Sequence, residues 1–436
     1  MAWRTVSRLH STVADSDMAH TVARAIVLLA TSMAFGETPQ TRVERLEDLI
    51  REALRANPEV HMAERLYQAA SQRPSREAAL PDPKLAVGYQ GVGRPYPLAG
   101  IGAEPMANLG FMYTQEFPAP GKRRLRAAIA YQDSQAILQE YLGARLRLIS
   151  QLKQAYYQLS YTWAASGVLE RNRRLLEQIL EVSQARYGAG LVPQQDVLKA
   201  QTELTLLEAR HEEILARRRL HEAELRQLLA RPARSPLGQP QPLRDPENLP
   251  PVSRLLEAAA RNSPLLAGRE SAIAGAELAL NLARKDFYPD WALSGGYFNM
   301  GRMGSMYMFR AEFTLPLFAA RKQRPGVGEA YQRLIAERRR YEAEALQLRL
   351  RIEQEYLAAD RSARLARIYS AAAIPQAQLT LESSLASYQT GAVNMLTVLS
   401  NFASVLDYEL GYWNEVVSYY SAVSRLEELT GEVLLK

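Results

Sequence analysis

The sequence predicts a mainly α-helical fold with a small β part, built from two copies of one pattern of helices and strands. Three observations predict this class. Apolar residues recur at helical spacing over long stretches without proline. Four short segments alternate apolar and polar residues, which is typical of strands with one apolar face. Landmarks of the first half return in the same order in the second half, which indicates an internal duplication.

The composition indicates a chain that can bury a large core. Of its 436 residues, 47% are hydrophobic and 23% are charged. The 53 basic and 47 acidic residues give a net charge of +6 without a sustained basic block, so no nucleic-acid partner is expected. Cysteine is absent, which excludes disulfides, thiolate metal sites and a lipid-modified cysteine in this sequence.

Residues 1–36 are predicted to be a signal peptide and leader. Arg24 precedes the apolar run AIVLLATSMAF, and the small residues Ala34 and Gly36 offer a cleavage site. Met18 is an alternative start of translation. The competing interpretation of this segment is a disordered or helical N-terminus.

Residues 37–230 are predicted to form the first structural repeat. It opens with helical spacing over residues 43–79 and continues with a strand pair at residues 84–117, whose strands are separated by a loop rich in glycine and proline. A long helix and a returning helix complete the repeat.

The long helix of the first repeat begins near Lys122 and meets no proline before Pro193. About 65 helical residues span about 100 Å, which is too long for the core of a compact domain. The chain reverses at YGAGLVPQQDV, where glycine and proline supply the turn, and residues 197–229 form the returning helix.

The second repeat is predicted over residues 252–436, after a proline-rich linker at residues 231–251. It contains a strand pair at residues 290–316, a second long helix and a second returning helix. The equivalent landmarks are Pro58 and Pro264, Pro81 and Pro289, Pro118 and Pro316, and Tyr187 and Tyr388.

The four strands need partners from other chains. Four strands with one apolar face cannot close into a barrel, and their open edges would leave backbone donors and acceptors unpaired. Their length matches tilted membrane strands of about 9 to 11 residues, and their alternation suits a water-filled barrel in a membrane. The sequence therefore predicts that several copies of the chain share one barrel.

The order of elements, the duplication and the segments YGAGLVPQQDVLKAQTEL and YQTGAVNMLTVL resemble the TolC family of bacterial outer-membrane efflux channels. The resemblance extends from about Val43 to Thr430. It implies a homotrimer in which three chains with four strands each form a twelve-stranded β-barrel, continued into the periplasm by an α-barrel of long antiparallel helical hairpins. The implied function is a passive export duct in the bacterial outer membrane, part of a tripartite efflux system.

The same resemblance implies the partners and the cargo. The helical turns would face the inner membrane, where a periplasmic adaptor (membrane fusion) protein and an inner-membrane efflux pump of the RND type dock. The adaptor-docking residues would be Gly188, Gly190, Leu191, Val192, Gly391, Ala392 and Val393. The segment QEFPAPGKR, residues 115–123, is similar to the heavy-metal efflux branch, so heavy-metal ions or small toxic compounds are the expected cargo.

Gate candidates follow from alignment with the family on the turn motif. Asp196 and Tyr388 match an aspartate and a tyrosine that pair when the family's channels close, and Gln195 matches a polar neighbour. The alternative is that Asp196 only caps the returning helix. Val393 stands where the family type member has an arginine, so the ion pairs of the second turn are not expected here.

Two basic clusters each follow a proline that ends a strand: Lys122, Arg123 and Arg124, and Arg321 and Lys322. They are expected at the membrane interface, in contact with the phosphates of outer-membrane lipids. The alternative for both clusters is an ordinary solvated first turn of a helix.

No enzymatic function, cofactor or metal site is predicted. The sequence contains no GxSxG, no phosphate-binding glycine loop and no HExxH. His211 and His221 lie ten residues apart in the returning helix, about 280° around its axis, so they cannot share a metal ion. Two alternative functions stay open: the outer-membrane component of a type I protein secretion system, and a periplasmic coiled-coil scaffold or adaptor.

Overall fold

A computed structural model describes residues 43–93 and 95–434 of the chain. The chain divides into two units, residues 1–43 and residues 44–436, and the fold below is that of the second unit. The predicted signal peptide and leader lie outside the described residues. Among the described helices, none has a segment that is both long and apolar enough to cross a membrane.

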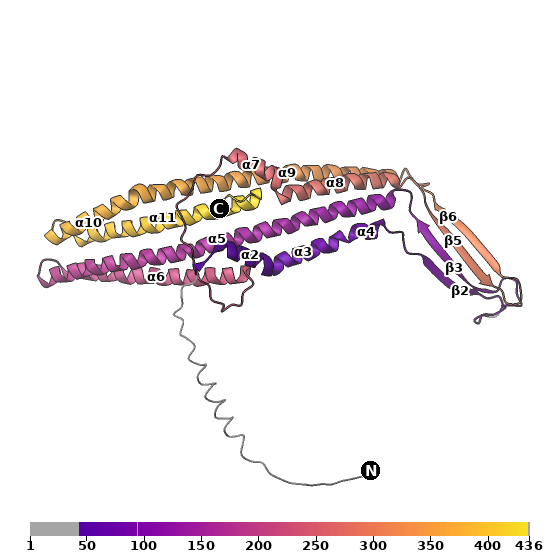
Figure 1. The fold of residues 1–436 in the computed structure, drawn as a ribbon, viewed down its shortest axis with the longest axis horizontal. Coiled ribbons are helices and arrows are strands. Elements are labelled where there is room, and N and C mark those ends of the chain that lie inside the picture. Colours follow the sequence, from indigo (N-terminus) through magenta and orange to yellow (C-terminus); the bar gives the residue numbers. More distant parts are fainter. Residues whose placement is uncertain (1–42, 94, 435–436) are drawn as a thin grey trace, which may run out of the picture. The chain divides into compact units, whose positions relative to one another are not determined.

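The elements of the two halves follow one another in the same order (Figure 1). The first half comprises β1 (Val43–Glu44), α2 (Leu46–Ala56), α3 (Pro58–Ser71), α4 (Arg73–Ala78), β2 (Lys84–Gln90), β3 (Asn108–Phe117), α5 (Lys122–Gly188), α6 (Gln194–Leu228) and β4 (Gln239–Pro240). The second half comprises α7 (Val252–Asn262), α8 (Pro264–Lys285), β5 (Asp290–Asn299), β6 (Met306–Thr314), α9 (Gln323–Ile368), the π-helical turn η1 (Tyr369–Ala373), α10 (Ile374–Thr390) and α11 (Met395–Thr430). The mainly helical fold with four strands and an internal duplication is confirmed.

Local sequence signals explain where several helices begin and end. The Asn57 side chain accepts a hydrogen bond from the Glu59 amide at 2.9 Å, with Pro58 at the first helical position, so α3 starts anew after α2. Asn394 caps α11 in the same way through the Thr397 amide at 3.0 Å. Gly391 ends α10 with φ of 83°, a left-handed conformation that favours glycine.

The strands β2, β3, β5 and β6 form one antiparallel sheet in that order. The register places Lys84, Thr114, Ser294 and Arg310 in one row across it. The Thr114 and Ser294 hydroxyls of this polar face lie 2.9 Å apart. Apolar side chains such as Phe309, which is 87% exposed, occupy the other face. Within the described residues, the outer edges of β2 and β6 have no strand partner, as the alternation predicted.

The long helices pack as two antiparallel hairpins (Figure 1), α5 with α6 and the α9–α10 segment with α11. The largest buried cluster lies between the two hairpins and includes Leu176, Ile179 and Phe402. A second cluster joins the middle of α5 to α2 and to the end of α6, with Leu152 fully buried. Packing between the halves therefore begins near the middle of α5 and extends to the turns.

The linker between the halves is bound to the helices by tyrosine side chains. The Gln241 amide donates to the Tyr156 hydroxyl at 2.7 Å, and the Tyr419 hydroxyl donates to the Glu247 carbonyl at 2.8 Å. Tyr420 donates to the Arg244 carbonyl at 3.3 Å. Burial is the largest cause that raises the pKa of Tyr419 to about 12, so its hydroxyl stays a donor at neutral pH.

The second long helix is interrupted, unlike the first. Helix α9 passes into η1 before α10, which carries Pro375 in its first turn, whereas α5 runs without a break. Proline has no N–H to donate and its ring clashes with the preceding turn, and a π turn absorbs such a disturbance. Tyr369 of η1 packs against α11, where a Cβ placed on Gly411 would lie 3.1 Å from the Tyr369 ring.

Candidate functional site

The two helical turns are built alike. Residues 189–193 join α5 to α6, and residues 391–394 join α10 to α11. Gly190, with φ of 72°, and Gly391 supply the left-handed positions that let each chain reverse. Of the predicted docking residues, Val192 and Val393 pack against the core between the hairpins, and five are exposed: Gly188, Gly190, Leu191, Gly391 and Ala392.

Asp196 and Tyr388 meet between the two hairpins. The Tyr388 hydroxyl donates a hydrogen bond to Asp196 Oδ2 at 3.2 Å. Tyr388 is 1% exposed and Asp196 is 7% exposed, so water competes little for this contact. Pro193, not Asp196, occupies the N-cap position of α6, and no side chain caps that helix. Asp196 therefore connects α6 to α10 across the hairpin boundary rather than capping its own helix.

The Tyr388 hydroxyl is held in its protonated form. Burial is the largest cause that raises the pKa of Tyr388 above its ordinary value of 10, and the neighbouring Asp196 carboxylate raises it further. Ser183 and Arg186 act in the opposite direction. A protonated phenol and a carboxylate make a charge-assisted hydrogen bond, which is stronger than one between neutral groups.

Arg186, in the last turn of α5, was not among the predicted site residues. Its guanidinium carbon lies 4.9 Å from the centre of the Tyr388 ring, which is cation–π geometry. Its Nε and Nη1 atoms are buried and have no hydrogen-bond partner within the described residues. A Cβ placed on Gly391 would come within 3.3 Å of Arg186 Nη2, so this arginine lies against the second turn as well.

Gln195 does not take part in this contact. It is exposed and makes no hydrogen bond within the described chain. Helical geometry gives the reason: Asp196, one residue on, turns toward the second hairpin, so Gln195 points about 100° away from it. The structure thus brings together two of the three predicted gate candidates and adds Arg186.

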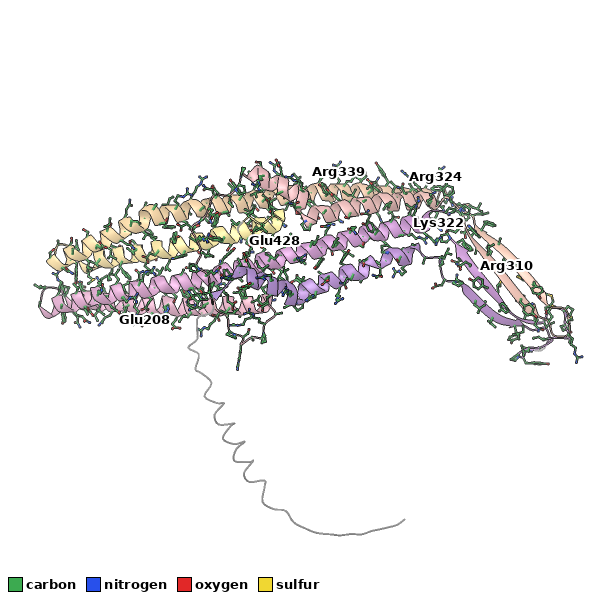
Figure 2. The ribbon with its side chains drawn as sticks, viewed as in Figure 1. Glu208, Arg310, Lys322, Arg324, Arg339 and Glu428 are labelled. Atoms are coloured by element: carbon green, nitrogen blue, oxygen red, sulfur yellow. The ribbon has the colours of Figure 1, made fainter. Side chains whose placement is uncertain are left out.

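The basic residues that follow the strands differ between the halves. Lys122 is buried, and its Nζ lies 3.1 Å from Asp286 and 3.0 Å from Asp290. Arg123 donates to the Ala78 carbonyl at 2.9 Å. This corrects the expectation that Lys122 faces lipid phosphates, because two carboxylates of the second half neutralise it inside the chain. Arg124, Arg321 and Lys322 are exposed, and Figure 2 shows Lys322 where α9 meets the sheet.

Within the part of the chain that the structure describes, no group of three or more histidine, cysteine, aspartate or glutamate side chains could hold a metal ion. His211 instead lies 3.0 Å from the Ser166 hydroxyl, and His221 lies 2.8 Å from Glu224. Each of the two histidines therefore makes its own local contact along the helices.

A four-stranded sheet with open edges, joined to duplicated helical hairpins that meet at their turns, defines a channel subunit of the outer-membrane type. The chain belongs to the outer membrane efflux protein family, whose sequence profile matches residues 49–231 and 255–432. The resemblance noted from the sequence is confirmed, and the protein is an outer-membrane channel protein. A comparison with curated protein sequences finds no match.

Solved structures share this fold at low sequence identity. The outer membrane protein VceC from Vibrio cholerae is 20% identical, with a TM-score of 0.74 over 88% of this chain and 96% of its own. CusC is 17% identical, with a TM-score of 0.76 over 91% of this chain and 94% of its own. The open state of the MtrE outer membrane channel from Neisseria gonorrhoeae is 20% identical, with a TM-score of 0.73 over 89% of each chain.

Proposed function

We propose that the protein is the passive outer-membrane duct of a tripartite efflux system and works as a homotrimer. The observation that supports this most is the sheet, whose edge strands β2 and β6 lack partners and whose apolar face is exposed. Three sheets joined edge to edge would satisfy these edges in a twelve-stranded barrel, and lipid would cover the apolar face. The helical hairpins would then surround the periplasmic part of the pore.

The proposed partners are a periplasmic adaptor (membrane fusion) protein at the turns and an inner-membrane pump of the RND type. Exposed Leu191 offers the adaptor an apolar contact beside the second turn. The proposed cargo is heavy-metal ions or small toxic compounds, on the resemblance of residues 115–123 to the heavy-metal branch. The pump would supply the energy, and the duct would contribute the water-filled path.

Reconstitution tests the duct. The purified protein should run as a trimer in native mass spectrometry and should give discrete conductance steps in planar bilayers. A stable monomer in water without detergent, or bilayers that stay silent, would contradict the proposal.

Asp196, Tyr388 and Arg186 are proposed as the latch that keeps the duct closed. They join the tips of two hairpins whose separation would widen the pore. The hydrogen bond between Tyr388 and Asp196 and the cation–π contact between Arg186 and Tyr388 would both have to break on opening. An adaptor that docks on the turns would favour the separated arrangement.

Arg186→Ala is expected to raise the open probability roughly threefold to tenfold, because a cation–π contact contributes about 0.5 to 2 kcal/mol. Single-channel recording measures this, with Arg186→Lys as the conservative variant that restores part of the closure. Tyr388→Phe keeps the ring and loses the hydroxyl, so the effect of Arg186→Ala should persist in that background. It should vanish in a Tyr388→Leu background, and an equal effect in both backgrounds would exclude the ring as the partner of Arg186.

A further inference from the structure

A basic cleft lies between the start of α5 and the end of α8. Its volume is about 750 Å³, and no carboxylate is among its lining residues. Three cationic side chains line it, one from α5 and two from the last turn of α8. The polar and charged lining residues are Arg124, Asn281, Arg284, Lys285 and Tyr288.

The three cations of this cleft have no acidic partner. Within the described residues, Arg124, Arg284 and Lys285 form no ion pair with a carboxylate. Arg284 donates to the Asn281 side chain at 3.4 Å, and Lys285 Nζ lies 5.0 Å from the centre of the Tyr288 ring. Like charges gathered in one cleft repel one another, and a bound anion removes that repulsion.

The adjacent junction shows the contrast. Lys122 is also at the start of α5, but it points to Asp286 and Asp290 and is neutralised by them. The carboxylates near this junction are thus engaged by one buried lysine, and the charge of the cleft remains available. The cleft therefore fits a ligand that brings its own negative charge.

The position of the cleft indicates where that charge comes from. Helix α8 ends at Lys285 and β5 begins at Asp290, so the cleft lies at the level where the sheet begins. Apolar side chains are exposed at this level: Tyr288 is 58% exposed, and Phe318, beyond β6, is 75% exposed. Cations beside exposed aromatic rings at the edge of a membrane sheet match the boundary between lipid headgroups and acyl chains.

We propose that this cleft binds the phosphate headgroup of an anionic phospholipid in the periplasmic leaflet of the outer membrane. Arg124, Arg284 and Lys285 bind the phosphate, and Tyr288 contacts the start of the acyl chains. The inference rests on the proposed function in one respect, the placement of the sheet in the bilayer. Free phosphate has the same headgroup chemistry but no acyl chain, so the two sources can be separated.

Native mass spectrometry in detergent micelles tests the cleft with phosphatidylglycerol, phosphatidylcholine and inorganic phosphate as separate probes. The wild-type protein is expected to bind phosphatidylglycerol at least tenfold more tightly than phosphatidylcholine. The variant Arg284→Gln/Lys285→Gln should bring this preference to within about twofold, because each cation near a lipid surface contributes about 1 kcal/mol. Inorganic phosphate at millimolar concentration should displace little of the lipid.

Two control variants remove the same charge elsewhere. Arg173→Gln/Arg174→Gln changes α5 in a part that pairs with Glu170, and Arg321→Gln/Lys322→Gln changes the other basic segment near the sheet. Both should keep the preference for phosphatidylglycerol. The proposal is overturned if the cleft variant binds like the wild type, if the second control loses as much as the cleft variant, or if inorganic phosphate alone displaces the lipid.

The same variants separate this inference from the duct itself. The cleft variant should conduct like the wild type in bilayers of neutral lipid, because the cleft lies far along α5 from the latch. If no variant and no wild-type protein conducts, the proposed duct fails while the micelle measurement still reports on the cleft. If all conduct and the lipid preference is unchanged, only the headgroup site fails.

Discussion

Asp196→Ala is expected to raise the single-channel conductance and the open probability of the reconstituted protein. The alanine removes the acceptor of the Tyr388 hydroxyl at a contact with almost no access to water. A hydrogen bond to a charged group contributes about 1.5 to 3 kcal/mol, so the closed state should lose roughly tenfold or more in population. Planar-bilayer recordings at fixed voltage measure both quantities.

Asp196→Asn is the matched control for this change. The amide keeps an acceptor oxygen and the shape of the side chain but loses the charge, so its conductance should lie between those of the wild type and Asp196→Ala. Val197 next to it is buried in the wall of α6, and Val197→Ala should alter stability without a comparable change in open probability. Equal conductance of the wild type and Asp196→Ala would count against the latch.

Lys153→Met is expected to cause the largest loss of stability. Lys153 Nζ lies 2.5 Å from Glu427 Oε2, both residues are buried, and the pair joins α5 to α11. Glu427 also accepts a hydrogen bond from the Leu434 amide at 2.8 Å, so it fixes the chain after α11. Removing the cation leaves a buried carboxylate without its charge partner, which costs about 3 to 5 kcal/mol.

Thermal unfolding in detergent at a fixed scan rate measures this loss as a lower midpoint. The double variant Lys153→Met/Glu427→Leu should recover most of it, because both charges are then absent and the site is apolar. Arg349→Met is the control, since its pair with Glu353 is exposed and contributes about 0 to 1 kcal/mol. A midpoint for Lys153→Met as high as that of Arg349→Met would show that the buried pair is not a stabilising contact.

The sequence predicted the elements that depend on local pattern. The strand alternation, the glycine and proline turns and the break at Asn57-Pro58 are all found, because each is set by neighbouring residues. The juxtaposition of Asp196 and Tyr388 could be anticipated only through the family resemblance, since 192 positions separate them. Their role as a gate remains a prediction.

The features that local pattern could not reveal depend on contacts between the halves. Arg186 looks like an ordinary cation at the end of a helix until Tyr388 is placed beneath it. Lys122 reads as exposed until Asp286 and Asp290 of the second half surround it. The linker has no periodicity, and only the folded chain shows that tyrosine hydroxyls bind its backbone. For η1, Pro375 was a visible signal of an interrupted helix.

The π turn sets the angular phase of everything that follows it in α10. A π turn holds one residue more than an α turn, and each residue rotates the following side chains by about 100° and advances them by about 1.5 Å. Tyr388 comes after this extra residue, whereas Asp196 follows the uninterrupted α5. Deleting one residue of η1 would turn the phenol away from the carboxylate while both reversals kept their sequence. The azimuth at which the hairpin tips face one another is therefore fixed by a single inserted residue at a distance from them.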